Sequence, residues 1–153
     1  FAGVYPLSHP FAQMQQLTSM MIYGVFERFP SLRVAFLEAG CGWAPYLADR
    51  LDESWEHRIN RWPHPTKKSP SEIMHGGNLY YSCEREEKTL ATVAELIGAT
   101  QILWASDFPH ERPWEEFSGD IDTLIGRKDL PESLPRQILF DNPRRLYNLK
   151  LEG

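Results

Sequence analysis

The sequence lacks the features of several large classes of protein. No apolar run approaches the roughly 20 residues that cross a bilayer, and no basic-then-apolar signal segment opens the chain. No basic stripe stands out in a chain of formal net charge −5, which argues against nucleic acid as the main partner. The two cysteines, Cys41 and Cys83, are too few and too far apart for a disulfide framework or a CxxC metal site. These absences predict a protein of the reducing cytoplasm, with neither a membrane nor a nucleic acid as its partner.

Familiar catalytic and nucleotide-binding motifs are missing as well. The chain has no P-loop, no GxGxxG and no GxSxG elbow. Ser106 directly precedes Asp107, so spacing alone does not make the two residues partners in a catalytic triad. No histidines stand in an HxH or HExxH arrangement, and we therefore expect that this chain alone cannot close a metal site. The chain begins FAGV without an initiator methionine, which indicates a sequence entered partway through a longer protein.

What is present is an alternation of helical and strand patterns, with 42% hydrophobic residues over 153 positions. Helical spacing of apolar residues predicts helices at residues 11–29, 43–59, 86–97, 114–126 and 132–148. Ser8 or His9 is expected to cap the first helix, with Pro10 at its first position, where a missing N–H costs nothing. Pro30 is expected to end that helix, and Gly98 the third.

Short apolar runs predict strands at residues 32–37, 78–84 and 101–106. The first run, LRVAFL, is typical of a strand buried on both faces. Residues 60–77, rich in proline, lysine and glycine, predict a long surface loop with one turn of helix. Strands that alternate with helices through short connections predict right-handed βαβ units, and hence an α/β fold with a parallel sheet. Three strands are too few for such a sheet to close on itself.

Each predicted strand ends in polar side chains. Glu38 follows the first strand, Cys83 and Glu84 the second, and Asp107 the third. Because the carboxyl ends of parallel strands lie on one rim, these side chains are expected to converge where α/β folds bind their ligands. Converging carboxylates indicate a cation site or an acid/base pair of perturbed pKa.

Each candidate also has a purely structural interpretation. Asp107 by itself is equally typical of a turn or cap, Glu84 of a solvated strand end, His110 of a loop histidine and His9 of a helix start. Glu38 is harder to explain in this way, since a charge directly after an apolar run is costly to bury unless it is paired. The other histidines are expected to face water: His57, His64 and His75. Three tryptophans are expected to pack in the core: Trp43, Trp55 and Trp104.

Four segments carry a resemblance to a known family: GVFERFPSLRVAFLEAGCGWAPYLADRLD (24–52), YYSCEREEKTL (80–90), ILWASDFPH (102–110) and DNPRRLYNL (141–149). In this order they resemble the C-terminal half of the amidohydrolase-related family of metal-dependent hydrolases and decarboxylases, which includes aminocarboxymuconate-semialdehyde decarboxylase and the resorcylate-type decarboxylases. The resemblance implies a TIM-type (β/α)₈ barrel with a divalent metal at its C-terminal rim. We therefore expect residues 1–153 to be a single partial domain, the C-terminal half of such a barrel.

The resemblance also implies roles for individual residues. The family's metal ligands are an HxH pair, a histidine after a middle strand and an aspartate after the last strand. Asp107 stands where that aspartate stands, and the histidine ligands would lie in an N-terminal half that this chain does not contain. Glu38, in LEAG, stands where many decarboxylating members have a histidine that acts as acid/base. Glutamate also transfers protons but adds negative charge beside the cation, which puts decarboxylation in doubt.

By resemblance, then, the expected function is metal-dependent hydrolysis of a small carboxylated or amide-like molecule through a metal-activated water. Asp107 would bind the metal and take a proton from that water, Glu38 would act as acid/base, and His9, Glu84 and His110 would face the substrate. Zinc is the favoured metal, with manganese or iron as alternatives.

Two alternatives to hydrolysis stay open. The first is a decarboxylase, a carbon–carbon lyase, of the same family. The second is a catalytically incomplete fragment that acts only as a folding or interaction unit. A homo-oligomer is expected, because a half barrel exposes unpaired strand edges that invite association.

Overall fold

The computed structural model describes residues 3–110 and 112–150. Within these ranges the strands are β1 (Val34–Phe36), β2 (Leu79–Cys83) and β3 (Ile102–Trp104). The α-helices are α1 (Tyr5–Ile22), α2 (Val25–Arg28), α3 (Trp43–Arg58), α4 (Pro70–Met74), α5 (Leu90–Val93), α6 (Asp120–Gly126), α7 (Leu134–Arg136) and α8 (Asn142–Tyr147). Turns of 3₁₀ or π-helix complete the described elements: Ile59–Arg61, Ala94–Gly98, Ala99–Gln101, Trp114–Gly119 and Gln137–Asp141.

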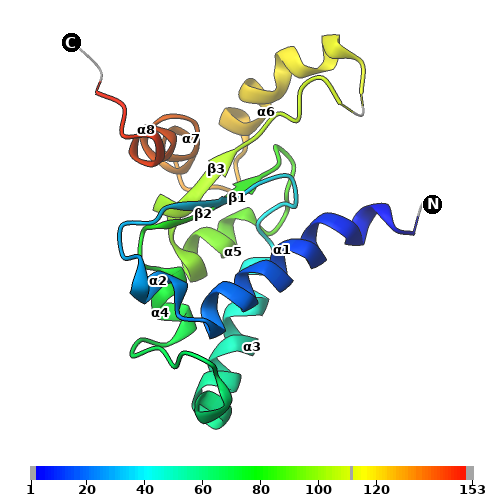
Figure 1. Cartoon of the computed structure of the whole chain (residues 1–153). Helices are drawn as coiled ribbons and strands as arrows, with labels where there is room; N and C mark the ends of the chain where they lie inside the picture. The colour runs from blue at the N-terminus through cyan, green and yellow to red at the C-terminus, as the bar shows by residue number, and fades with distance from the viewer. Residues whose placement is uncertain (1–2, 111, 151–153) are drawn as a thin grey trace.

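The three strands form one parallel sheet in the order β1-β2-β3. Phe36 of β1 lies opposite Tyr81 of β2, and Cys83 of β2 lies opposite Trp104 of β3. Helices α3 and α4 connect β1 to β2, and α5 connects β2 to β3. In Figure 1, α3 and α5 lie below the sheet, whereas α7 and α8 lie above it. Because the three strands are parallel, their carboxyl ends meet at one rim of the sheet.

An aromatic cluster fastens the sheet to α3. The rings of Phe36 and Tyr81 stack at 5.9 Å, and the ring of Trp43 packs edge-on against them at 5.7 and 5.6 Å. The indole N–H of Trp43 donates to the carbonyl of Gly40 at 2.9 Å, which gives its buried polar atom a partner. The expected core position of Trp43 is confirmed, and Trp55 and Trp104 pack against the same core.

The first helix differs from the prediction. It begins at Tyr5 rather than after a Ser8 or His9 cap, holds Pro10 in its interior, and ends at Ile22. Pro10 therefore lies beyond the first turn, where proline removes the backbone hydrogen bond to the carbonyl of Pro6. The helix ends early because Gly24 takes a left-handed conformation, φ 63°, where a Cβ would lie 3.2 Å from that of His64. Residues 25–28 then form the separate short helix α2.

Two further predictions were wrong in detail. The run 32–37 gives a strand of only three residues, in which Phe36 alone is buried, because β1 is the edge of the described sheet. The third helix begins at Leu90 rather than at 86, because the carboxylate of Glu87 binds backbone N–H groups and holds residues 84–89 as a loop. Gly98 ends that helical segment as predicted, with φ 115°.

The remaining predicted elements are confirmed within a few residues. The helix expected at 43–59 is α3, and the loop expected at 60–77 contains the single turn α4. The three histidines expected to face water are exposed: His57, His64 and His75. In the ranges that the structure describes, no helix is long and apolar enough to cross a membrane.

Candidate active site at the strand rim

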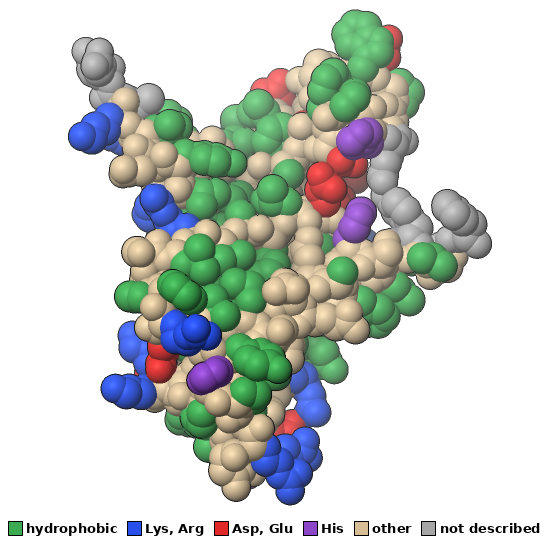
Figure 2. Space-filling view, viewed as in Figure 1, with side chains coloured by type: hydrophobic (Ala, Val, Ile, Leu, Met, Phe, Trp, Pro, Cys, Tyr) green, Lys and Arg blue, Asp and Glu red, His purple; other side chains and the backbone are tan. Residues whose placement is uncertain are grey.

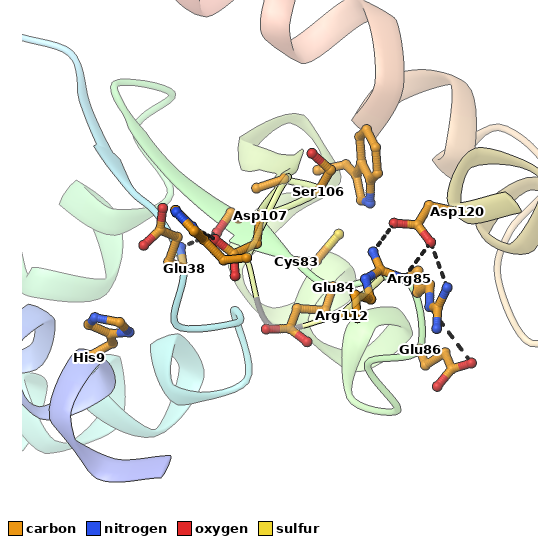
Figure 3. Close-up of a pocket in the computed structure, with 14 residues that line it drawn as sticks. His9, Glu38, Cys83, Glu84, Arg85, Glu86, Ser106, Asp107, Arg112 and Asp120 are labelled. Carbon is orange, nitrogen blue, oxygen red and sulfur yellow. Dashed lines mark hydrogen bonds and ion pairs between the residues drawn. The ribbon is translucent and has the colours of Figure 1, made fainter. Parts of the chain in front are cut away.

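A cavity of about 330 Å³ opens at the carboxyl ends of the strands. All five residues expected at the site line it: His9, Glu38, Glu84, Asp107 and His110. Figure 3 shows that they come from separate parts of the fold, with His9 on α1 and the carboxylates on loops after the strands. On the surface, acidic and histidine side chains lie next to one another on one side of the molecule (Figure 2). The fold thus brings the candidates together, and their chemical roles stay predictions.

Asp107 sits in a tight turn just after β3. Its backbone is left-handed, φ 56°, a conformation that residues other than glycine adopt rarely and mostly at sites where the surroundings enforce it. Its carbonyl accepts the backbone N–H of His110 at 2.7 Å, and its Oδ1 accepts Nδ1–H of the same histidine at 3.2 Å. Within the described residues, no hydrogen bond uses Oδ2. The turn therefore holds one carboxylate oxygen in place and leaves the other available at the rim.

Glu38 lies two residues beyond β1 and is also left-handed, φ 63°. Its backbone N–H donates to Oγ of Ser82 on β2 at 3.0 Å, which anchors the residue to the neighbouring strand. The side chain of Glu38 is exposed, so the cost of burying an unpaired charge does not arise at this position. The strand ends at Phe36, so Glu38 has already left the sheet where it faces the cavity.

Sequence reasoning missed Glu87, which lies in the loop after β2 and does not line the cavity. Its carboxylate accepts the backbone N–H groups of Cys41 at 3.0 Å and of Gly42 at 2.7 Å, at the start of α3. It also accepts the hydroxyl of Thr89 at 3.1 Å. A Cβ on Gly42 would lie 2.7 Å from Oγ1 of Thr89, so this close approach requires glycine. The pattern GCG after the first strand was the available signal, but it does not identify the carboxylate.

Sequence reasoning also missed a cluster of Asp120 with two arginines. The carboxylate of Asp120 is 1% exposed and accepts Nη1–H of Arg85 at 2.6 Å and Nη1–H of Arg112 at 2.9 Å. Nη2 of Arg112 donates to its second oxygen. The hydrogen bonds from Arg112 hold the pKa of Asp120 below its usual value, against the opposite effect of burial and with help from Arg85. No signal in the sequence links residues so far apart.

The two cysteines are free, buried thiols. Burial raises the pKa of Cys83 to about 12, and the charge of Glu87 adds to the effect. Burial, followed by the charge of Glu87, also raises the pKa of Cys41 far above its usual range. Because the thiolate is the form that attacks electrophiles and binds metals, these pKa shifts disfavour both reactions at Cys41 and Cys83.

The donor set fits a divalent cation only in part. Asp107 offers a free carboxylate oxygen, a ligand type suited to Mn²⁺ and Zn²⁺. Across residues 3–110 and 112–150, no group of three or more His, Cys, Asp or Glu is arranged to hold a metal. The described residues therefore supply one ligand rather than a complete site.

Comparison with known proteins identifies the family and the fold of the chain. A family model described as "Amidohydrolase" matches residues 7–149. Among solved structures, the chain is similar to an amidohydrolase from Mycobacterium avium subsp. paratuberculosis K-10, with 28% identity and a TM-score of 0.70. The match covers 87% of this chain and 32% of that protein, so the chain spans about a third of its length.

Two decarboxylases share the fold at lower identity. They are 5-carboxyvanillate decarboxylase from Sphingomonas paucimobilis (24% identity, TM-score 0.67, 86% of this chain and 38% of that one) and a dihydroxybenzoic acid decarboxylase from Polaromonas sp. JS666. The latter matches with 21% identity and a TM-score of 0.69 over 91% of this chain and 40% of that one, and its structure holds manganese and the inhibitor 2-nitroresorcinol. The prediction of a parallel α/β fold that forms part of a TIM-type barrel is confirmed.

Proposed function

The chain belongs to the amidohydrolase family, and on that premise we propose that it carries one side of the active site of a metal-dependent hydrolase. The observation that supports this most directly is the placement of Asp107 and Glu38 on the wall of one cavity at the strand rim. Its substrate is a small carboxylated or amide-like molecule. The remaining metal ligands come from a part of the barrel that this chain does not contain, so that residues 1–153 form its C-terminal half.

Each residue has a distinct task in this proposal. Asp107 would hold the cation through its carboxylate, whose orientation is fixed by the hydrogen bond from His110 to Oδ1. A bound Zn²⁺ or Mn²⁺ lowers the pKa of water and polarises carbonyl oxygens, which is the chemistry that hydrolysis needs. Glu38, exposed to the cavity and without a protein partner among the described residues, moves protons to and from the reacting groups. His9 and Glu84 contact the substrate.

The test is Asp107→Asn in the complete enzyme, assayed with Zn²⁺ or Mn²⁺ and with metal content measured in parallel. Loss of one carboxylate ligand is expected to abolish the metal-dependent activity and lower the metal content while the circular dichroism spectrum stays the same. Asp122→Asn, an exposed aspartate of α6, is the matched control and should behave as wild type. Full activity with unchanged metal content in Asp107→Asn would mean that Asp107 is only a turn residue.

Decarboxylation is the second candidate, because structures with this fold include decarboxylases. The two reactions differ in their product, since only decarboxylation releases CO₂. Assays with 5-carboxyvanillate and 2,6-dihydroxybenzoate, the compounds named for similar structures, separate them. CO₂ release by the complete enzyme that disappears in Glu38→Gln would replace hydrolysis with decarboxylation and keep Glu38 as the proton-transfer group.

A further inference from the structure

The cavity has a basic end that the proposed catalytic groups do not use. Arg85, from the loop after β2, and Arg112, from the segment before α6, both line the cavity wall. Both donate to the buried carboxylate of Asp120 (Figure 3). Their side chains are 30% and 22% exposed, whereas that of Asp120 is 1% exposed. One buried carboxylate therefore holds two guanidinium groups at the edge of the cavity.

A single arginine is enough to neutralise the buried carboxylate of Asp120. Arg112 already donates to both oxygens of Asp120, which is the bidentate pairing that neutralises a buried carboxylate. The ring of Phe117 lies 3.9 Å below its guanidinium and holds it in place. Arg85 adds a second positive charge to the same carboxylate. The cluster of three residues thus has one charge more than Asp120 can balance.

Arg85 and Arg112 also have N–H groups that make no hydrogen bond to Asp120. A guanidinium carries five N–H groups, and the bonds to Asp120 use one from Arg85 and two from Arg112. The carboxylate of Glu86 lies 3.9 Å from Nε of Arg85, but its side chain is 74% exposed, so water screens this pair. Donors on both arginines therefore remain free for a bound molecule.

Negatively and positively charged side chains are distributed unevenly along the cavity. Figure 3 shows Glu38 and Asp107 at one end and Arg85, Arg112 and Asp120 at the other. Two further carboxylates line the cavity: Glu84 lies between the two groups, and Glu86 lies beside Arg85. An anionic group entering the cavity is repelled by the carboxylates and attracted to the arginines.

We propose that Arg85 and Arg112 form a subsite that binds a carboxylate group of the substrate, with Asp120 as the positioning residue that aligns them. The planar fork of a guanidinium matches the two oxygens of a carboxylate. This inference rests on the proposed function and narrows it, because it selects the carboxylated substrates over the amide-like ones. It also orients the substrate, with this anionic group away from Glu38.

Benzoate is the probe, and benzamide is its uncharged counterpart of the same shape. Both are titrated by calorimetry into protein freed of metal by chelation, so that no cation can hold the carboxylate. Benzoate is expected to bind about tenfold more tightly than benzamide, and Arg85→Gln and Arg112→Gln are each expected to weaken benzoate binding about tenfold. Arg136→Gln is the matched control, because its side chain is 74% exposed on α7 and does not line the cavity.

Several outcomes would overturn the subsite. They are no benzoate binding by the wild type, equal binding of benzoate and benzamide, or unchanged benzoate binding in both glutamine variants. Inorganic phosphate binding more tightly than benzoate would overturn the assignment to a carboxylate. If Arg85→Gln does not fold, Arg85→Lys is the alternative variant. It keeps the positive charge but loses the planar guanidinium that matches a carboxylate, so weaker benzoate binding is expected.

The Asp107→Asn variant separates this inference from the proposed function. It is expected to lose metal-dependent activity while the metal-free protein still binds benzoate at the arginines. Activity that survives in Asp107→Asn would contradict the proposed function alone, whereas benzoate binding that ignores the arginines would contradict the subsite alone.

Discussion

Glu87 shows how much a single side chain contributes to the shape of the rim. It lies in the loop that carries Glu84, and its carboxylate binds the backbone of Cys41 and Gly42 in the loop that carries Glu38. Gly42 is the N-cap of α3, so its N–H has no partner within the helix, and a negative charge at this end is also favoured by the helix dipole. The two loops that bring carboxylates to the cavity are therefore fixed to each other.

We expect Glu87→Gln to lower the free energy of unfolding by about 1–3 kcal/mol, because the amide offers one acceptor oxygen in place of two and loses the charge. Urea unfolding followed by circular dichroism measures the change. Glu95→Gln, an exposed glutamate in the turn 94–98, should change the stability by less than about 0.5 kcal/mol. Equal stability of Glu87→Gln and wild type would show that the hydrogen bonds of Glu87 add nothing to folding.

Asp120 makes the stability depend on acid. Its pKa in the folded protein is lowered, first by the hydrogen bonds from Arg112, from an ordinary value of 3.8. Its contribution is therefore present above the unfolded-state pKa and is lost as the pH falls through the folded-state pKa. Thermal melts are expected to show wild-type stability falling below about pH 4, with a shallower fall in Asp120→Asn. The same slope in both proteins would contradict this assignment.

At the scale of elements, Asn142 attaches α8 to the sheet. Its side chain is fully buried, and its Nδ2 donates to the carbonyls of Ala99 and Ile102 at 2.8 Å each. Ile102 is the first residue of β3, the strand that leads to Asp107. The C-terminal helix thus holds the start of the strand whose other end carries the proposed metal ligand.

Asn142→Leu is expected to lower the free energy of unfolding by about 1–3 kcal/mol, since two buried carbonyls lose their donor. The change is measured by urea unfolding, with Asn60→Leu at an exposed position as the control. If α8 positions β3, hydrogen exchange at the amides of β3 should also become faster in Asn142→Leu. Unchanged exchange together with unchanged stability would mean that α8 packs there without supporting the strand.

At the scale of the whole molecule, the described sheet has two open edges. Within residues 3–110 and 112–150, β1 and β3 each pair on one side only. Exposed apolar side chains precede and follow β1: Phe29 is 52%, Leu32 38% and Leu37 45% exposed. Unpaired strand edges beside apolar side chains are surfaces on which chains associate.

We therefore expect the 153-residue chain to self-associate reversibly in sedimentation equilibrium. Leu32→Lys should weaken the association, because a charge would be buried in the contact beside β1. Tyr46→Lys, at a 63% exposed position on α3, is the control and should leave it unchanged. A chain that stays monomeric at all concentrations would show that the open strand edges and these apolar side chains do not drive association.

Local patterns in the sequence determined the architecture and predicted where the candidate site lies. Short, nearly continuous apolar runs with helical repeats between them indicated parallel βαβ units, and the polar residues after each run indicated the rim. Both inferences depend only on neighbours along the chain and on the common direction of parallel strands. For this reason Glu38, Glu84 and Asp107 were found from sequence, and all three line the cavity.

Tertiary structure alone decided what surrounds these carboxylates. Glu87 binds backbone groups 45 and 46 residues away, and Asp120 binds an arginine 35 residues away. Such contacts have no period and no fixed spacing, because they depend on which loops the fold brings together. The same holds for Glu38, whose exposure follows from where β1 ends. The strands are predictable because they depend on the pattern of neighbouring residues along the chain. The partners of a side chain at the rim are determined only when the folded strands and loops come together.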